Sequence, residues 1–350
     1  LRIFFKQPVL FKSKPIKDNV ISDYSVKIFY AVQNQLFNKN NFEKIKIDIA
    51  FPELEKLKSD RKKALQLRQL DNPQKVRINI IYKGKGYPAS ARLKGDLSEH
   101  WGNIKQWSLR IKLRNKKTIF SMNEFSISVF TERDFPYNFV ISETFRKYDV
   151  LTPRYKTVKV VFNGDDWGLM LLEEQFHDSF YAFNEIKEAP IFKMTNENDF
   201  LINSIASKDT KNLKDISKWQ GKLETKLFNE NEILKKTNIP GKQTNNNLFS
   251  IFKTLQEIVV LEDERYIQDI NKFIDIKSFA RASAITAVFG DTHSVLPYNS
   301  RYYLNPYDLK VRPILTDTTH SEIDSNFFSK HNLFYRNIFQ LEEFQNEFFG

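Results

Sequence analysis

Cysteine is absent from the 350-residue sequence. The chain therefore cannot form disulfide bonds, use a thiolate nucleophile or build a cysteine-based zinc site. The five histidines offer no substitute, because no two of them stand at the His-x-x-x-His spacing that places two imidazoles on one helical face. The sequence thus predicts no zinc site, and a disulfide-free fold leaves the redox compartment open.

Long apolar runs are also missing. No stretch approaches the roughly 18 consecutive apolar residues of a membrane-spanning helix, so the sequence predicts no transmembrane segment. The first residue is Leu1 and not methionine, and a signal or anchor upstream of it is compatible with the sequence. The localisation therefore stays open: cytoplasmic, or exported or membrane-anchored if such a segment exists.

Two widespread enzyme motifs are absent as well. The chain has no Gly-x-Ser-x-Gly sequence and no glycine-rich loop that ends in Lys-Ser or Lys-Thr. The first absence argues against a serine hydrolase of the α/β type, and the second argues against a P-loop nucleotide hydrolase.

Core-forming residues, by contrast, are plentiful. Hydrophobic residues make up 41% of the chain, 32 of them phenylalanine, which favours a folded protein over a disordered one. The net charge of +11 permits an anionic partner. Because the lysines are scattered and no nucleic-acid-binding module accompanies them, nucleic acid is not the favoured partner. Binding to a polyanion is kept as an alternative, and it predicts salt-sensitive binding without nucleotide specificity.

Alternation of apolar and polar residues predicts several β-strands in the first half of the chain. A strand at 44–49 precedes a helix over 53–70, which Pro52 opens. The Asn163-Gly164 pair predicts a hairpin over 157–173. Further strands are expected at 76–80, 89–93, 108–113 and 125–129, and a further helix at 134–148.

The second half of the chain carries less pattern. Residues 195–247 are poor in apolar periodicity, and helices are expected at 248–260 and 276–289. Strands at 301–304 and 311–315 enclose a turn at Asn305-Pro306. Strands come first and helices later, so the order favours an α+β protein with two lobes over a repeat protein.

Three polar residues near the end of the chain form a candidate site. Asp291 follows the expected helix 276–289, Asn299 precedes the first strand of the hairpin, and Asp317 follows the second. Because a hairpin brings its two ends together, Asn299 and Asp317 could share one metal ion, while Asp291 serves an acceptor hydroxyl. Phosphoryl transfer needs these oxygen groups. The same residues are also common in turns at strand ends, so spacing alone favours turn residues over a functional site.

Several ordered motifs resemble the CotH kinase family, a group of atypical kinases named for a spore-coat protein. The resemblance extends from about Arg92 to Asp317 and rests on the order and spacing of its pieces. These are Arg92-Leu93-Lys94-Gly95, Asn163-Gly164 with Gly168-Leu169-Met170-Leu171-Leu172-Glu173-Glu174-Gln175, Ile191-Phe192-Lys193, Asn299-Ser300-Arg301-Tyr302-Tyr303-Leu304 and Pro313-Ile314-Leu315-Thr316-Asp317.

The resemblance implies a two-lobed, protein-kinase-like α+β fold. Residues 1–74 would form an N-terminal extension of a strand plus a helix, and 75–350 the CotH-like kinase domain. Within that domain, 75–194 would be a β-rich first lobe, and 195–350 a mostly helical second lobe that carries the metal-site hairpin. The implied activity is ATP-dependent transfer of phosphate to a protein hydroxyl, with Mg²⁺ or Mn²⁺. The protein substrate and the oligomeric state stay unidentified.

The resemblance also implies roles for individual residues. Asp317 and Asn299 match the family's metal ligands, and Asp291 matches the catalytic acid that positions the acceptor hydroxyl. Glu174 would hold a phosphate-binding lysine, for which Lys193 and Lys94 are the two candidates. Strand alternation adds that Glu173 or Glu174 should point inward and need a cationic partner.

Two departures from the family pattern leave catalysis open. The family's final Trp-Asp-x-Asp is Thr316-Asp317-Thr318-Thr319 here, which removes one possible metal ligand unless Glu322 or Asp324 takes its place. The hairpin's usual tyrosine is Met170. The sequence therefore supports an active kinase and, as its alternative, a catalytically inactive pseudokinase that acts as a surface or assembly binding protein.

Overall fold

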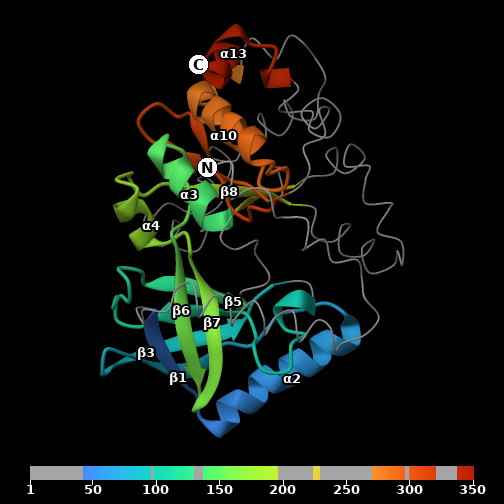
Figure 1. Ribbon diagram of the computed structural model, residues 1–350, viewed down its shortest axis with the longest axis vertical. Coiled ribbons are helices and arrows are strands. Elements are labelled where there is room, and N and C mark those ends of the chain that lie inside the picture. Colours follow the sequence, from blue (N-terminus) through green and yellow to red (C-terminus); the bar gives the residue numbers. More distant parts are fainter. Residues whose placement is uncertain are drawn as a thin grey trace, which may run out of the picture. The chain divides into compact units, whose positions relative to one another are not determined.

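The computed structural model describes residues 42–95, 98–129, 137–195, 224–228, 270–295, 299–320 and 337–350 (Figure 1). The chain divides into two compact units, Leu1–Glu43 and Lys44–Gly350. Nearly all of the first unit lies outside the described residues, so the description below concerns the second.

Seven strands in the first part of this unit close into a barrel. Their order around the barrel is β1-β2-β3-β4-β5-β7-β6, with every assigned pair antiparallel. The strands are β1 (Glu43–Asp48), β2 (Val76–Tyr82), β3 (Lys85–Leu93), β4 (Leu109–Leu113), β5 (Glu124–Val129), β6 (Tyr155–Phe162) and β7 (Asp165–Glu174).

Alternating side chains of several strands fill the barrel. Ile45 and Ile47 of β1 and Ile78 and Ile80 of β2 are buried, and the residues between them face outward. On these strands, the two-residue period specifies both the register and the inward side, whereas β5 is buried along its whole length.

One asparagine fastens the first strand to the last. Asn163 Oδ1 accepts a hydrogen bond from Ile49 N at 2.8 Å, and its Nδ2 donates to Ile49 O at 3.0 Å. The Asn163 backbone N–H also donates to Ile47 O at 2.9 Å. The turn residue that ends β6 therefore also closes the barrel against β1.

Helix α2 (Phe51–Leu67) lies along the outside of the barrel, where it contacts β2 and β3 (Figure 1). It buries Leu57, Asp60 and Ala64 and leaves its lysines exposed. Pro52 lies in its first turn, where the missing N–H has no intrahelical partner to lose.

The second part of the unit is built on a four-stranded antiparallel sheet of order β11-β10-β8-β9. The strands are β8 (Ile191–Thr195), β9 (Glu224–Leu227), β10 (Arg301–Leu304) and β11 (Val311–Ile314). Helix α10 (Ile276–Phe289) buries Phe279 in the same apolar cluster as Tyr302 and Leu304 of β10. Helices α3 (Tyr137–Lys147) and α13 (Glu342–Phe349) pack beside α10, and α4 (Asp178–Phe183) is short (Figure 1).

The expected two-lobed, protein-kinase-like fold with a helical second lobe is wrong. The β-rich part is a closed barrel, and the described residues hold only five helices. The segments 191–195 and 224–227 are strands that extend the 301–314 hairpin into a sheet, which the weak periodicity of that region did not reveal. The expected helix at 248–260 lies outside the described residues.

Strand β1 agrees with the strand expected at 44–49. It was expected in a separate extension, yet it pairs with β2 inside the barrel.

Within the described parts of the chain, no helix combines the length and apolar character needed to cross a membrane.

Candidate functional site

Asp291 is held at the end of α10 by the way that helix terminates. Gly290 caps the helix with φ +68°, a left-handed conformation that glycine adopts without steric cost, and the chain turns directly into Asp291. The Asp291 side chain is buried, with 1% of the residue exposed. Its Oδ1 accepts from His293 N and Ser294 N at 3.1 Å each, and its Oδ2 accepts from Ser294 Oγ at 2.5 Å.

A fourth donor ties Asp291 to a different segment. Thr319 N donates to Asp291 Oδ1 at 3.3 Å. Burial raises the pKa of the Asp291 carboxyl, against the opposing effect of the hydrogen bonds from Ser294, Thr319 and His293. A carboxylate with a raised pKa is a better proton acceptor, which is the property that a general base needs.

Asn299 and Asp317 stand at the two open ends of the β10–β11 hairpin, in which Arg301 lies opposite Ile314. Asn299 Nδ2 donates to His293 O at 3.0 Å, and Thr316 Oγ1 donates to Asn299 O at 3.2 Å. The hairpin therefore brings these two predicted residues into one hydrogen-bonded network.

His293 connects this network to Asp317. Its Nδ1 lies 2.8 Å from the Asp317 backbone carbonyl and 3.9 Å from the Asp317 Oδ2. Since a carbonyl oxygen can only accept, the Nδ1 carries the proton. Asp317 itself has φ +60°, a left-handed conformation that aspartate tolerates better than most residues and that recurs at functional sites.

The donor atoms suit a hard divalent cation. The Asn299 amide points its nitrogen at His293, which leaves its oxygen as the metal-binding atom, and Asp317 contributes a carboxylate. No group of three or more His, Asp or Glu side chains in the described segments could form a metal site alone. Mg²⁺ commonly uses one or two protein ligands and takes the rest from phosphates and water, so the pair Asn299–Asp317 fits it.

Lys94 lies on the barrel, at the end of β3. Its Nζ is 2.6 Å from Glu173 Oε2, and Tyr155 OH donates to the other oxygen of Glu173 at 3.3 Å. Gly95 follows with φ +91°, and a Cβ there would come within 2.0 Å of the His100 ring, so glycine lets His100 pack against this position. Lys94 is thus held by the carboxylate next to Glu174.

Glu174 binds an arginine. Its side chain is fully buried, and Arg154 approaches it with both Nε, at 2.8 Å, and Nη2. Arg154 also lies 4.3 Å from the Phe183 ring centroid. Lys193 is on β8, opposite Lys226 of β9. The structure joins Lys94 to Glu173, the neighbour of Glu174.

Comparison with known sequence families gives an assignment. Residues 91–349 match the family described as CotH kinase protein, which covers most of the chain. The chain belongs to the CotH kinase protein family. No curated protein sequence matches it.

The residues that depart from the CotH pattern have structural roles, two of them in the same network. Thr316 binds the Asn299 carbonyl, and the backbone N–H of Thr319 binds Asp291. Between them, the Thr318 hydroxyl is buried without a hydrogen-bond partner. Met170 fills part of the barrel core. The described residues that directly follow β11, 315–320, are therefore tied to the rest of the candidate CotH site by backbone groups and hydroxyls, and Asp317 is the one carboxylate among them.

Two residues of the network were missed from the sequence. Ser294 stands three positions after Asp291, a spacing at which a carboxylate commonly accepts hydrogen bonds from a following turn, and this signal could have found it. Arg154 carries no such signal, because its partner Glu174 is 20 positions away and only the β6–β7 pairing brings them together.

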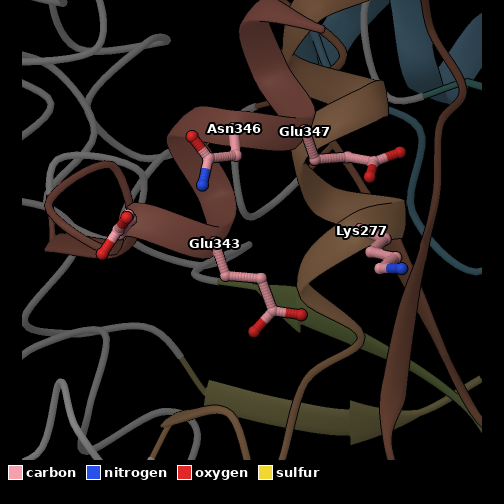
Figure 2. A pocket seen from close by; sticks show the side chains of 5 residues that line it. Lys277, Glu343, Asn346 and Glu347 are labelled. Carbon is pink, nitrogen blue, oxygen red and sulfur yellow. The ribbon is translucent and has the colours of Figure 1, made fainter.

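A pocket of about 470 Å³ lies away from these residues, on α10 and α13. Figure 2 shows Glu343 and Asn346 on α13 and Lys277 on α10; Glu342 and Glu347 complete the lining. Glu347 is paired with Arg281 at 2.6 Å. None of the sequence-predicted site residues lines this pocket.

Proposed function

We propose that the protein is a CotH-like kinase that binds ATP with Mg²⁺ or Mn²⁺ and transfers phosphate to a protein hydroxyl. One observation carries the proposal. Asp291, Asn299 and Asp317, which come from three separate segments, belong to one network joined through His293, His293 being bonded to Asn299 and Asp317.

The proposed roles follow from the atoms available. Asn299 Oδ1 and the Asp317 carboxylate would hold the metal, which when bound offsets the negative charge of the phosphates. Lys94 would contact a phosphate oxygen, and Glu173, at 2.6 Å, would keep its ammonium in place.

Asp291 would serve the acceptor. The acceptor hydroxyl would give its proton to the Asp291 carboxylate, directly or through the Ser294 hydroxyl that donates to Oδ2. The hydroxyl oxygen then bonds to the γ-phosphorus while the bond from that phosphorus to the bridging oxygen breaks, so that ADP leaves. The raised pKa of Asp291 supports its role as the proton acceptor.

A second candidate function rests on the hydrogen bonds that the Asp291 carboxylate already accepts. Its buried carboxylate already accepts four hydrogen bonds, and Thr319 stands where the family pattern has a second carboxylate. These features favour an inactive pseudokinase that acts as a binding protein, with the network serving only to shape the loops.

Thermal denaturation with ATP and Mg²⁺ or Mn²⁺ separates the two candidates. For the kinase we expect a metal-dependent rise in Tm that Asp317→Ala abolishes, since binding to the native state alone at 100 times Kd adds about 2.7 kcal/mol. Asp308→Ala, in the turn of the same hairpin, is the matched control and should keep the rise. No rise with millimolar nucleotide in the unmodified protein would rule out the kinase and favour the binding protein.

A further inference from the structure

The two halves of the proposed site belong to different sheets. Lys94 and Glu173 lie on the barrel, whereas Asp317 follows the last strand of the second sheet. Transfer of a phosphoryl group requires the groups that hold it to keep a fixed relation, because displacement by about 1 Å can cost on the order of a hundredfold in rate. Some part of the chain must hold the two halves together.

The segment 151–155, which joins α3 to β6, is bonded to the Asp317 side at its first end. Leu315 N donates to Leu151 O at 2.9 Å, and Leu151 forms a parallel bridge with Ile314. Thr152 Oγ1 donates to Leu315 O at 3.0 Å, and Thr152 is fully buried. Leu315, two residues before Asp317, is thus fixed to this segment by a backbone hydrogen bond from its N–H and by the Thr152 hydroxyl on its carbonyl.

The other end of the segment is bonded to the Lys94 side. Tyr155 OH donates to Glu173 Oε1 at 3.3 Å, and the other oxygen of Glu173 contacts Lys94 at 2.6 Å. Arg154 holds Glu174 through its guanidinium, and Glu174 N donates to Arg154 O at 2.9 Å. Two successive residues therefore bind the two successive carboxylates at the end of β7.

The middle of segment 151–155 has little conformational freedom. Pro153 fixes its own φ and restricts the residue before it, so the segment cannot easily bend in the middle. Its carbonyl accepts from Arg146 Nη1 at 3.1 Å, which ties it to α3. The Tyr155 ring lies 6.3 Å from the Phe139 ring of the same helix.

We infer that segment 151–155 positions Lys94 and Asp317 relative to each other, and that Thr152 and Tyr155 are positioning residues for the phosphate and metal groups of the proposed site. The structural coupling between Lys94 and Asp317 rests on these contacts alone, whereas its effect on phosphate transfer rests on the proposed function. Neither residue touches the reacting atoms; each acts on them through Leu315 or through Glu173.

The test uses two variants that each remove one hydroxyl. Thr152→Val loses the bond to Leu315, and Tyr155→Phe loses the bond to Glu173. Thr144→Val, which loses a bond to Val140 O, and Tyr181→Phe, which loses a buried bond to Ala189 O, remove the same groups elsewhere and serve as controls. Urea denaturation of all four measures any general loss of stability.

Hydrogen–deuterium exchange on the ligand-free protein is the first readout. Tyr155→Phe should speed amide exchange about threefold to tenfold at 315–320, the far end from the change. Thr152→Val should do the same around Lys94 and Glu173. Changes confined to the near end of each variant, or equal changes in the controls, would overturn the inference.

Ligand titration gives the functional readout and separates the two proposals. Mn²⁺ affinity without nucleotide should fall about threefold to tenfold in Tyr155→Phe, and ATP affinity in EDTA should fall similarly in Thr152→Val. The double variant should lose less than the product of the two single losses, because both act through one segment. If the unmodified protein binds neither ligand, the proposed function fails, whereas the exchange result still decides the positioning role.

Discussion

Glu173 and Glu174 are adjacent on β7, yet their carboxylates bind cations from different parts of the chain. Glu173 holds Lys94 at 2.6 Å, and Glu174, which lies opposite the core residue Phe125, holds Arg154. Successive side chains on a strand point to opposite faces, so this dipeptide can serve two purposes at once. We expect the Arg154 pair to support the fold and the Lys94 pair to support ligand binding.

Removal of Arg154 tests the first expectation. Arg154→Met should lower the free energy of unfolding by about 3–5 kcal/mol, because it leaves the buried Glu174 carboxylate without its cation. The double variant Arg154→Met/Glu174→Gln should recover part of that loss. Urea denaturation followed by circular dichroism measures both. Lys159→Met, which breaks the exposed pair with Asp166, should cost no more than about 1 kcal/mol.

Lys94 should matter more for ATP than for stability. Lys94→Met is expected to weaken ATP binding about tenfold to a hundredfold, the effect of losing one hydrogen bond to a charged group. Lys94→Arg keeps the charge beside Glu173 and should retain much of the affinity. Isothermal titration with ATP and Mg²⁺ provides the comparison, and equal affinities in all three proteins would exclude Lys94 from the phosphate site.

Glu124 makes stability depend on pH at the acid end. Burial by itself would raise the pKa of Glu124, but Arg110, at 2.7 Å, and Lys112, at 3.1 Å, hold the pKa below its ordinary value. A depressed pKa contributes stability that is present above the unfolded-state value of about 4.3 and disappears as the pH falls through the folded-state value.

The unmodified protein should therefore exceed Glu124→Gln in Tm at pH 7, and this difference should shrink below about pH 4. Thermal denaturation from pH 7 down to the acid transition measures it. The exposed Glu99 supplies the control Glu99→Gln, which should follow the unmodified protein throughout. A difference that stays constant with pH would show that the two cations do not act through the Glu124 charge.

Asp291 should have the opposite dependence. Its pKa is raised by burial, so its contribution to stability is greatest when it is protonated and falls as the pH rises through that pKa. Asp291→Asn keeps an oxygen for the three backbone donors and offers an amide to Ser294. In metal-free buffer, the difference in Tm between Asp291→Asn and the unmodified protein should therefore change in favour of the variant as the pH rises from acid to neutral. Phosphate transfer, if present, should disappear in this variant.

Local periodicity predicts individual strands and helices, but it cannot predict that the strands close into a barrel. The strands at 76–80 and 125–129 and the helix at 276–289 agree with β2, β5 and α10. Of the two strands, β2 buries alternate residues, whereas β5 is buried on both faces. Barrel closure depends on contacts between β1 and the end of β6, residues more than 100 positions apart. No local pattern reports such a contact.

The candidate site, too, could be predicted from the sequence only in part. The hairpin bonds Asn299 to Thr316, the residue before Asp317, since antiparallel pairing fixes the ends of a hairpin. A metal ion shared by Asn299 and Asp317 stays a prediction. The expectation that one of Glu173 and Glu174 needs a cation falls short of the structure, in which both are paired. Which cation each one takes is set by packing between strands, and the roles of Lys94, Lys193 and Asp291 in catalysis stay predictions.

The hydrogen bonds that join Asn163 to Ile47 and Ile49 have a practical consequence for how the protein can be truncated. The match to the CotH kinase protein family begins at residue 91, inside β3, whereas the barrel needs β1 and β2. A truncated form that starts at the family boundary would lose β1, β2 and most of β3, and would expose unpaired edges on β4 and β6. Open edges of this kind recruit other chains, so we expect such a fragment to aggregate, while a form that starts before Glu43 stays monodisperse.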